Sequence, residues 1–294
     1  MIGELSALAT AFCWSGSSIS FAEASLLIGS VRVNVTRLIL AGLLLGVTLI
    51  LFDVPVDLSF SQFAYLFLSG VFGLVFGDSF LFKSYEYNGP RISALVMSSA
   101  PAFAAVLAYF ILGEYLSMWA IGGMFITLIG IGLVVLSRQE PTGRFRGITA
   151  QGILFAFLGA CGQAGGLITA KLAFDQGSIN GFAATSIRIV SALLFLIPIS
   201  IASRRFLAPW KLYAARKKAF GLTLLGAVLG PYFGITLSLI AIQHTEVAIA
   251  ATIMATVPII MLPLVKIVYH EVLSWRAYAG AFIAVAGVAI LFLI

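Results

Sequence analysis

Long apolar stretches separated by short polar turns run through the whole chain. A helix that crosses a lipid bilayer needs about 20 mostly apolar residues, and ten stretches of roughly that length can be counted. The pattern therefore predicts ten transmembrane helices, at residues 3–22, 31–52, 62–83, 92–112, 118–137, 148–171, 180–202, 219–240, 246–268 and 275–294. The connecting segments are too short to hold a second soluble domain.

The second half of the chain repeats the first. Prolines, glutamates, glycines and arginines recur in the same order, as in Pro101 with Pro258, Glu114 with Glu271, GLVFG at 73–77 with GPYFG at 230–234, and Arg37 with Arg188. Because each copy contains five spans, an odd number, the second copy enters the membrane from the opposite side. We therefore predict an all-α membrane protein of two inverted five-helix repeats, at 1–140 and 147–294, around a central cavity.

Composition and charge agree with a membrane protein. Hydrophobic residues make up 61% of the 294 residues and charged residues only 10%, against about 25% charged in soluble domains. The net charge of +6 comes from lysines and arginines in short loops, above all in segment 204–218. The positive-inside rule explains this charge without nucleic acid and places the opposite loop, with Asp53 and Asp57, outside. We expect a multi-pass protein of the cell inner membrane with both termini outside.

Three charged residues, Arg37, Asp78 and Arg188, lie well inside the predicted spans, away from the span ends. A charge inside the bilayer costs at least about 2.5–3.5 kcal/mol, so it is kept where it has a partner or a wet cavity. Arg37 and Arg188 lie equally deep in their spans, and either face a cavity or snorkel to the interface. Asp78 has no counterpart, because Ile235 stands at the matching position. Its carboxylate could pair with Arg37, carry a proton, or sit at a solvated helix end.

Other polar and aromatic residues are candidates for the same central space. Aromatic rings with a few polar groups suit an amphipathic metabolite, although each residue could equally be part of the packed core. The candidate cavity residues are Trp14, Ser15, Ser18, Asn34, Arg37, Asp78, Ser99, Gln163, Thr185, Arg188, Tyr232 and Thr256, and the hinge candidates are Pro101 and Pro258. Cys13 and Cys161 lie in apolar runs without ligand spacing, so no metal or cofactor is expected.

The chain resembles a known transporter family. Ten spans as five plus five, Trp14-Ser-Gly in the first span, Arg37 in the second, and the turns LGEYLS at 112–117 and HEVLSW at 270–275 are similar to the EamA-type family of the drug/metabolite transporter superfamily. The resemblance covers essentially the whole chain and implies a ten-helix transporter of small metabolites, in a family whose members export amino acids, including aromatic ones. Many relatives have a basic N-terminus and a basic loop after the second span, which this chain lacks.

These observations favour a secondary transporter that exports small organic metabolites, such as aromatic or hydrophobic amino acids, by alternating access. Its expected partners are that metabolite and the lipid bilayer, with protons as a candidate coupling ion and the chain as a monomer or weak homodimer. No P-loop is present to support ATP hydrolysis. An enzyme is not expected, because the chain has no HExxH or GxSxG motif and no His/Cys cluster. The alternative is a membrane scaffold or receptor that does not transport.

Overall fold

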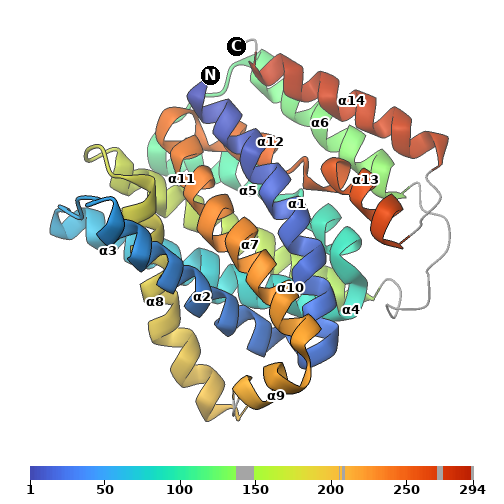
Figure 1. The fold of residues 1–294 in the computed structure, drawn as a ribbon. Coiled ribbons are helices and arrows are strands. Elements are labelled where there is room, and N and C mark those ends of the chain that lie inside the picture. Colours follow the sequence, from blue (N-terminus) through green and yellow to red (C-terminus); the bar gives the residue numbers. More distant parts are fainter. Residues whose placement is uncertain (137–148, 205, 207–208, 270–273, 293–294) are drawn as a thin grey trace.

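The computed structural model describes residues 1–136, 149–204, 206, 209–269 and 274–292, and every regular element in these ranges is a helix (Figure 1). The first half contains α1 (Ile2–Ile28), α2 (Ser30–Leu51), α3 (Phe60–Gly70), η1 (Val71–Gly77), α4 (Asp78–Met97), α5 (Ala100–Leu107), η2 (Ala108–Leu112) and α6 (Met118–Leu136). The second half contains α7 (Ala150–Phe174), α8 (Gly181–Ala202), α9 (Pro209–Ala215), α10 (Lys217–Ala227), η3 (Val228–Gly234), α11 (Ile235–His244), α12 (Val247–Met254), α13 (Val257–Tyr269) and α14 (Trp275–Phe292). The predicted boundary between the repeats, at 140–147, lies outside the described residues.

Seven helical segments are long and apolar enough to cross a membrane within the described ranges. They are Ser30–Leu51, Phe60–Pro90, Ile92–Leu112, Ala150–Phe174, Gly181–Ala202, Lys217–His244 and Val247–Leu264. Two shorter apolar helices, Met118–Leu133 and Trp275–Ile290, fall within α6 and α14. The helix α1 has 27 residues but is more polar, with six serines. The prediction of an all-α membrane protein is confirmed, and seven of its ten spans meet these criteria of length and hydropathy.

The third span continues well beyond its predicted end at residue 83. Helix α4 remains helical through polar residues because the start of α7 satisfies them: Ser84 Oγ donates to the Gly152 carbonyl at 2.8 Å, and Asn88 Oδ1 accepts from the Thr149 amide at 2.9 Å. The helix then breaks at Gly89, where φ is 73° and ψ is 174°. Only glycine adopts this backbone conformation without strain, and Pro90 after it starts the next helical stretch.

The two halves run in opposite directions. Thr245, just after α11, donates a hydrogen bond to the Glu4 carboxylate in the first turn of α1 at 3.2 Å. Lys171 Nζ in the last turn of α7 donates to the Ile242 carbonyl near the end of α11 at 2.8 Å. The beginning of α1 and the end of α7 therefore meet at the same end of the molecule, so the first helices of the two halves are antiparallel.

The halves also pack with approximate two-fold symmetry. The corresponding helices α2 and α8 contact each other, as do α6 and α14, which lie side by side in Figure 1. In addition, α3, η1 and α4 pack on α7 while α10, η3 and α11 pack on α1. The first helix of each half thus packs against the third span of the other half. This exchange brings side chains from both halves to the centre of the molecule.

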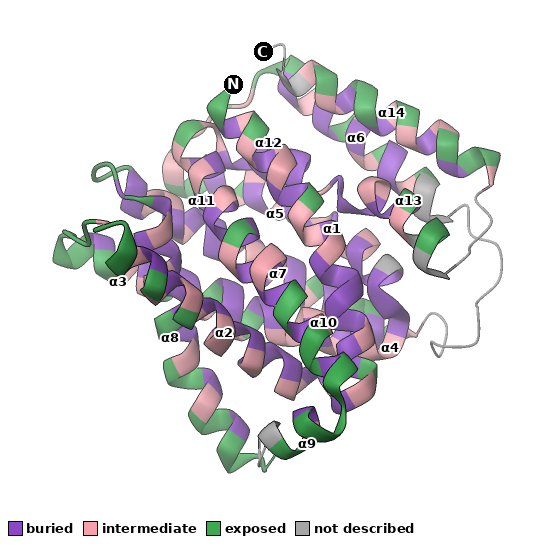
Figure 2. Ribbon diagram, viewed as in Figure 1, coloured by how far each residue is buried: buried purple, intermediate pink, exposed green. Residues whose placement is uncertain are grey.

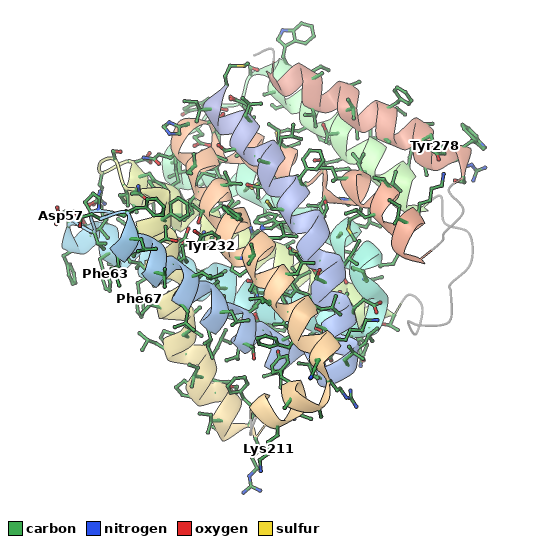
Figure 3. All side chains as sticks on the ribbon, in the orientation of Figure 1. Asp57, Phe63, Phe67, Lys211, Tyr232 and Tyr278 are labelled. Carbon is green, nitrogen blue, oxygen red and sulfur yellow. The ribbon has the colours of Figure 1, made fainter. Side chains whose placement is uncertain are left out.

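Apolar side chains cover the outside of the bundle as well as its core. Buried positions lie on the inward helix faces in Figure 2, whereas large apolar residues such as Phe110 and Phe282 are exposed. In Figure 3, Phe63 points outward from α3, and Lys211 projects from α9 at a different end of the molecule from Asp57. A soluble protein does not expose so much apolar surface, and a bilayer would cover it.

Candidate functional site

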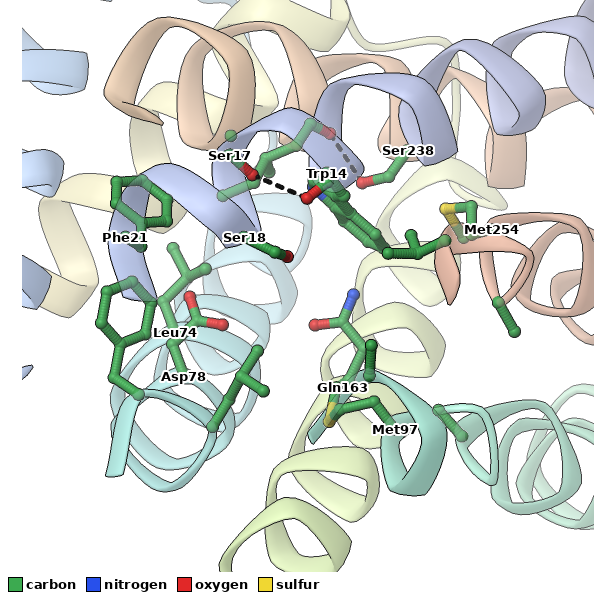
Figure 4. A pocket seen from close by; sticks show the side chains of 18 of the residues that line it. Trp14, Ser17, Ser18, Phe21, Leu74, Asp78, Met97, Gln163, Ser238 and Met254 are labelled. Atoms are coloured by element: carbon green, nitrogen blue, oxygen red, sulfur yellow. Dashed lines mark hydrogen bonds between the residues drawn. The ribbon is translucent and has the colours of Figure 1, made fainter. Parts of the chain in front are cut away.

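A cavity of about 120 Å³ lies between the two halves. This is well above the roughly 10–15 Å³ that a cavity needs to hold one water molecule. The lining polar side chains are Ser17, Ser18, Arg37, Asp78, Tyr85, Ser98, Gln163, Arg188 and Ser238. The larger apolar ones include Trp14, Phe21, Leu74, Phe82, Met97, Ile235 and Met254. In Figure 4, Asp78, Gln163 and Ser18 point into the same space, beside the ring of Trp14.

The structure brings half of the predicted cavity residues together and places the others behind the wall. Lining the cavity are Trp14, Ser18, Arg37, Asp78, Gln163 and Arg188. Outside it are Ser15, Asn34, Ser99, Thr185, Tyr232 and Thr256. The hydroxyls of Ser15, Ser99, Thr185 and Thr256 donate to carbonyls of the preceding helical turn, to Ala11, Val96, Gly181 and Ile253. Serine and threonine in apolar helices commonly satisfy themselves in this way, so their polarity alone did not indicate a cavity.

Tyr232 and Asn34 are displaced for other reasons. The Tyr232 hydroxyl lies 2.7 Å from Thr48 Oγ1 and its ring lies against Phe182, so it joins η3 to α2 and α8. Asn34 stands behind Arg37 and accepts hydrogen bonds from its Nε and Nη2 at 3.0 and 2.9 Å. Its amide holds the guanidinium in place without reaching the cavity.

Arg37 forms an ion pair with Asp78. Nη2 of Arg37 on α2 donates to Oδ2 of Asp78 at the first position of α4. The guanidinium carbon also lies 4.6 Å from the ring centre of Phe82 and 5.2 Å from that of Phe21, which adds cation–π attraction. Both charged side chains are buried, so neither the solvated helix end considered for Asp78 nor a snorkelling Arg37 fits the structure.

Arg188 is buried without such a partner. Its relative exposure is 2%, so snorkelling is excluded here as well. Among the described residues its side chain has no ion pair, and its buried Nε has no hydrogen-bond acceptor. The guanidinium lies against Gly73 in η1, where an added Cβ would come within 2.7 Å of Nη2. Ile235, at the position that matches Asp78, supplies no charge.

Glycines let the first half approach α7 closely enough to form the cavity wall. A Cβ on Gly162 would lie 2.5 Å from the Cα of Gly77, and one on Gly166 would lie 2.9 Å from that of Gly73. The GxxxG spacing at 73–77 therefore faces a second glycine pair on α7, which allows the two backbones to touch. This contact places Asp78 and Gln163 on facing elements of one wall.

The hinge candidates do not kink continuous helices. The chain leaves the helix at Ser98–Ser99, between α4 and α5, and at Ala255–Thr256, between α12 and α13. Pro101 and Pro258 follow as the second residues of α5 and α13. Proline has no backbone N–H to contribute, so the first turn of a helix accepts it at little cost. The prolines therefore begin the second segment of each broken helix.

Sequence reasoning missed several cavity residues, chiefly Ser17, Phe21, Phe82, Tyr85, Ser98 and Ser238. The aromatic ones looked like ordinary core residues, and only the position of Arg37 reveals their role. A signal did exist for Met97 and Met254, which match each other in the repeat and both line the cavity. Flexible methionine side chains adapt to ligands of different shape.

Comparisons with known proteins agree with the two-repeat architecture. The model of the EamA-like transporter family matches twice, at residues 1–136 and 150–293. One solved structure, described only as the crystal structure of a protein, is similar with a TM-score of 0.73 at 14% identity, covering 99% of this chain and 96% of its own. That likeness shows a shared fold. No curated protein sequence matches the chain significantly.

Proposed function

Because the chain belongs to the EamA-like transporter family, we propose that it is a secondary transporter that exports small organic metabolites, amino acids with aromatic or apolar side chains among them. One observation carries this proposal above the others: a cavity built from both of two oppositely directed halves, with two buried arginines and one carboxylate in its wall. A packed scaffold would have no need for such costly groups at its centre.

The mechanism we propose is alternating access. Two inverted repeats have nearly the same structure, so the molecule can exchange the conformations of its halves and open the cavity to one side at a time. The ten predicted spans, five in each half, belong to this proposal. The breaks at Ser98–Ser99 and Ala255–Thr256 are suitable hinges, because each borders the cavity and separates two helical segments.

The orientation and energy coupling are also part of the proposal. Loop charge favours both termini outside the cell inner membrane, with the lysines and arginines around α9 in the cytoplasm. Protons remain the candidate coupling ion, with Asp78 as the group that would carry them once its ion pair with Arg37 opens. The chain is proposed to act as a monomer or weak homodimer.

Counterflow of labelled amino acids and related metabolites in proteoliposomes tests the proposal. We expect label to enter vesicles that are preloaded with unlabelled substrate. In Trp14→Ala we expect this uptake to fall at least about tenfold, since Trp14 contributes an aromatic face to the cavity. Trp119→Ala is the matched control, because Trp119 is 75% exposed on α6. Absence of counterflow across a broad panel would instead support the scaffold or receptor.

A further inference from the structure

The two repeat-related arginines differ in what surrounds them. Arg37 has a carboxylate and an amide within hydrogen-bond distance, from Asp78 and Asn34. Arg188 has neither. Ile235 occupies the position that matches Asp78, and Thr185 occupies the position that matches Asn34.

Thr185 does not replace the missing acceptor. Its hydroxyl donates to the Gly181 carbonyl at 2.7 Å and lies 3.1 Å from Thr236 Oγ1, and the structure shows no hydrogen bond between it and Arg188. Asp78 attracts Arg188 electrostatically, but its ion pair is with Arg37. A desolvated guanidinium without an acceptor is costly, and charges of this kind inside a membrane protein typically serve a function. The described part of the chain therefore provides no anion that pairs with Arg188.

The cavity has the charge and shape to receive that anion from outside. The residues that line it include two arginines and one aspartate, so the wall carries one net positive charge when all three are ionised. A single carboxylate would neutralise it, whereas a phosphate, with about −1.5 to −2 charges at neutral pH, would leave an excess of negative charge. The remaining wall is largely aromatic and aliphatic, as in Trp14, Phe82 and Met254, and suits an apolar body.

We propose that Arg188 binds the carboxylate of the transported molecule. The substrate carboxylate would then take the place of an acidic side chain at position 235, where the second repeat has Ile235 instead. The substrate class is then organic acids with one carboxylate and an apolar or aromatic body, with or without an amine. This inference rests on the proposed transport function and adds to it the group that must be recognised. Arginine suits the role because its planar fork donates two parallel hydrogen bonds to a carboxylate.

Binding to the purified protein in nanodiscs tests the choice of head group. Isothermal titration calorimetry compares four compounds that share a phenyl ring. 3-Phenylpropionate carries a carboxylate, L-phenylalanine a carboxylate and an amine, phenethylamine an amine, and phenyl phosphate a phosphate. We expect both carboxylates to bind at least about tenfold more tightly than the amine, since the amine would add a second unpaired cation. We expect phenyl phosphate to bind more weakly than 3-phenylpropionate.

Three substitutions separate charge recognition from folding. Arg188→Gln is expected to raise the dissociation constant for 3-phenylpropionate by about 30-fold or more, the usual effect of removing one member of a buried charged pair. Ile235→Asp rebuilds in the second half the acid of the first, and is expected to pair with Arg188 and abolish the preference for carboxylates. Ile235→Asn introduces a side chain with the shape of aspartate but without its charge, and is expected to keep that preference.

The outcomes distinguish this inference from the transport function. If counterflow occurs while the amine binds as well as the carboxylates, or if Ile235→Asp leaves the preference unchanged, transport stands and the role of Arg188 is wrong. Tighter binding of phenyl phosphate than of 3-phenylpropionate also overturns the carboxylate assignment. If no compound of the broad panel gives counterflow, the transport function fails and the inference fails with it.

Discussion

The ion pair between Arg37 and Asp78 can be tested by removing its carboxylate. Asp78→Asn keeps the shape of the side chain and leaves Arg37 charged and buried without a counter-ion. The two side chains are only 5% and 13% exposed, which places this pair among buried salt bridges rather than surface ones. Breaking a buried pair on one side costs about 3–5 kcal/mol, against about 0–1 kcal/mol for an exposed pair.

The structure indicates the lower end of that range. Arg37 would keep its two hydrogen bonds to Asn34 and its contacts with the rings of Phe82 and Phe21. These contacts hold part of the charge in place, so we expect a loss of about 3 kcal/mol in the free energy of unfolding. The double variant Arg37→Met/Asp78→Leu removes both charges and is expected to lose less than Asp78→Asn alone, because no buried charge is left unpaired.

Reversible unfolding in mixed micelles with increasing dodecyl sulfate measures these differences. Asp57→Asn serves as the control, since Asp57 is exposed in the loop after α2 and its replacement is expected to change stability by less than about 0.5 kcal/mol. The reasoning is refuted if Asp78→Asn is no less stable than this control. It is also refuted if the double variant loses as much stability as Asp78→Asn or more, since removing both charges leaves neither unpaired.

Further predictions concern packing, pH and gating. Gly162→Ala should cost about 1–3 kcal/mol in unfolding because its Cβ would lie 2.5 Å from the facing backbone, whereas Gly122→Ala, with no atom within 4 Å, should cost nothing. Burial raises the pKa of Glu114, in the turn before α6, above its ordinary value of 4.5. The folded state thus binds this proton more tightly, so stability should fall as pH rises from about 4.5 to the raised pKa, and Glu114→Gln should flatten that slope in unfolding measured across pH. Pro101→Ala and Pro258→Ala should slow counterflow several-fold with substrate affinity unchanged, because they favour continuous helices across the breaks; an unchanged rate would argue against hinges there.

The helical architecture and the repeat could be predicted from the sequence because both depend on patterns along the chain. Apolar stretches of bilayer length identify helices, and matched glycines and prolines identify corresponding turns and close contacts. The same patterns explain the errors in helix bounds. The third span runs past its predicted limit, to the break at Gly89, because Ser84 and Asn88 have hydrogen-bond partners at the start of α7. Partners from the other half cannot be read from a local stretch of sequence.

The candidate site was most predictable for residues whose polarity has no local solution. Arg37, Asp78, Gln163 and Arg188 cannot satisfy themselves on an apolar helix, and all four line the cavity. Hydroxyl groups behave differently. Those of Ser15, Ser99, Thr185 and Thr256 donate to carbonyls of the preceding turn, so their presence in the sequence does not indicate a cavity. The same limit explains Glu114. In the sequence it marks a turn that recurs in both halves, yet its carboxylate accepts a hydrogen bond from the amide of Val247 at the start of α12 in the other half.

Symmetry and its breaking have separate roles in this molecule. The features shared by both halves, such as the π-helical segments at Val71–Gly77 and Val228–Gly234, build elements whose conformations the halves would exchange in the proposed alternating access. Features present once cannot be exchanged, so they stay in one half whichever side is open. Asp78 pairs with Arg37 in the first half, whereas Ile235 stands at the matching position of the second half and leaves Arg188 with unsatisfied charge. A substrate carboxylate at Arg188 would therefore stabilise the second half selectively, and an acid at position 235 would remove that difference between the loaded and empty protein.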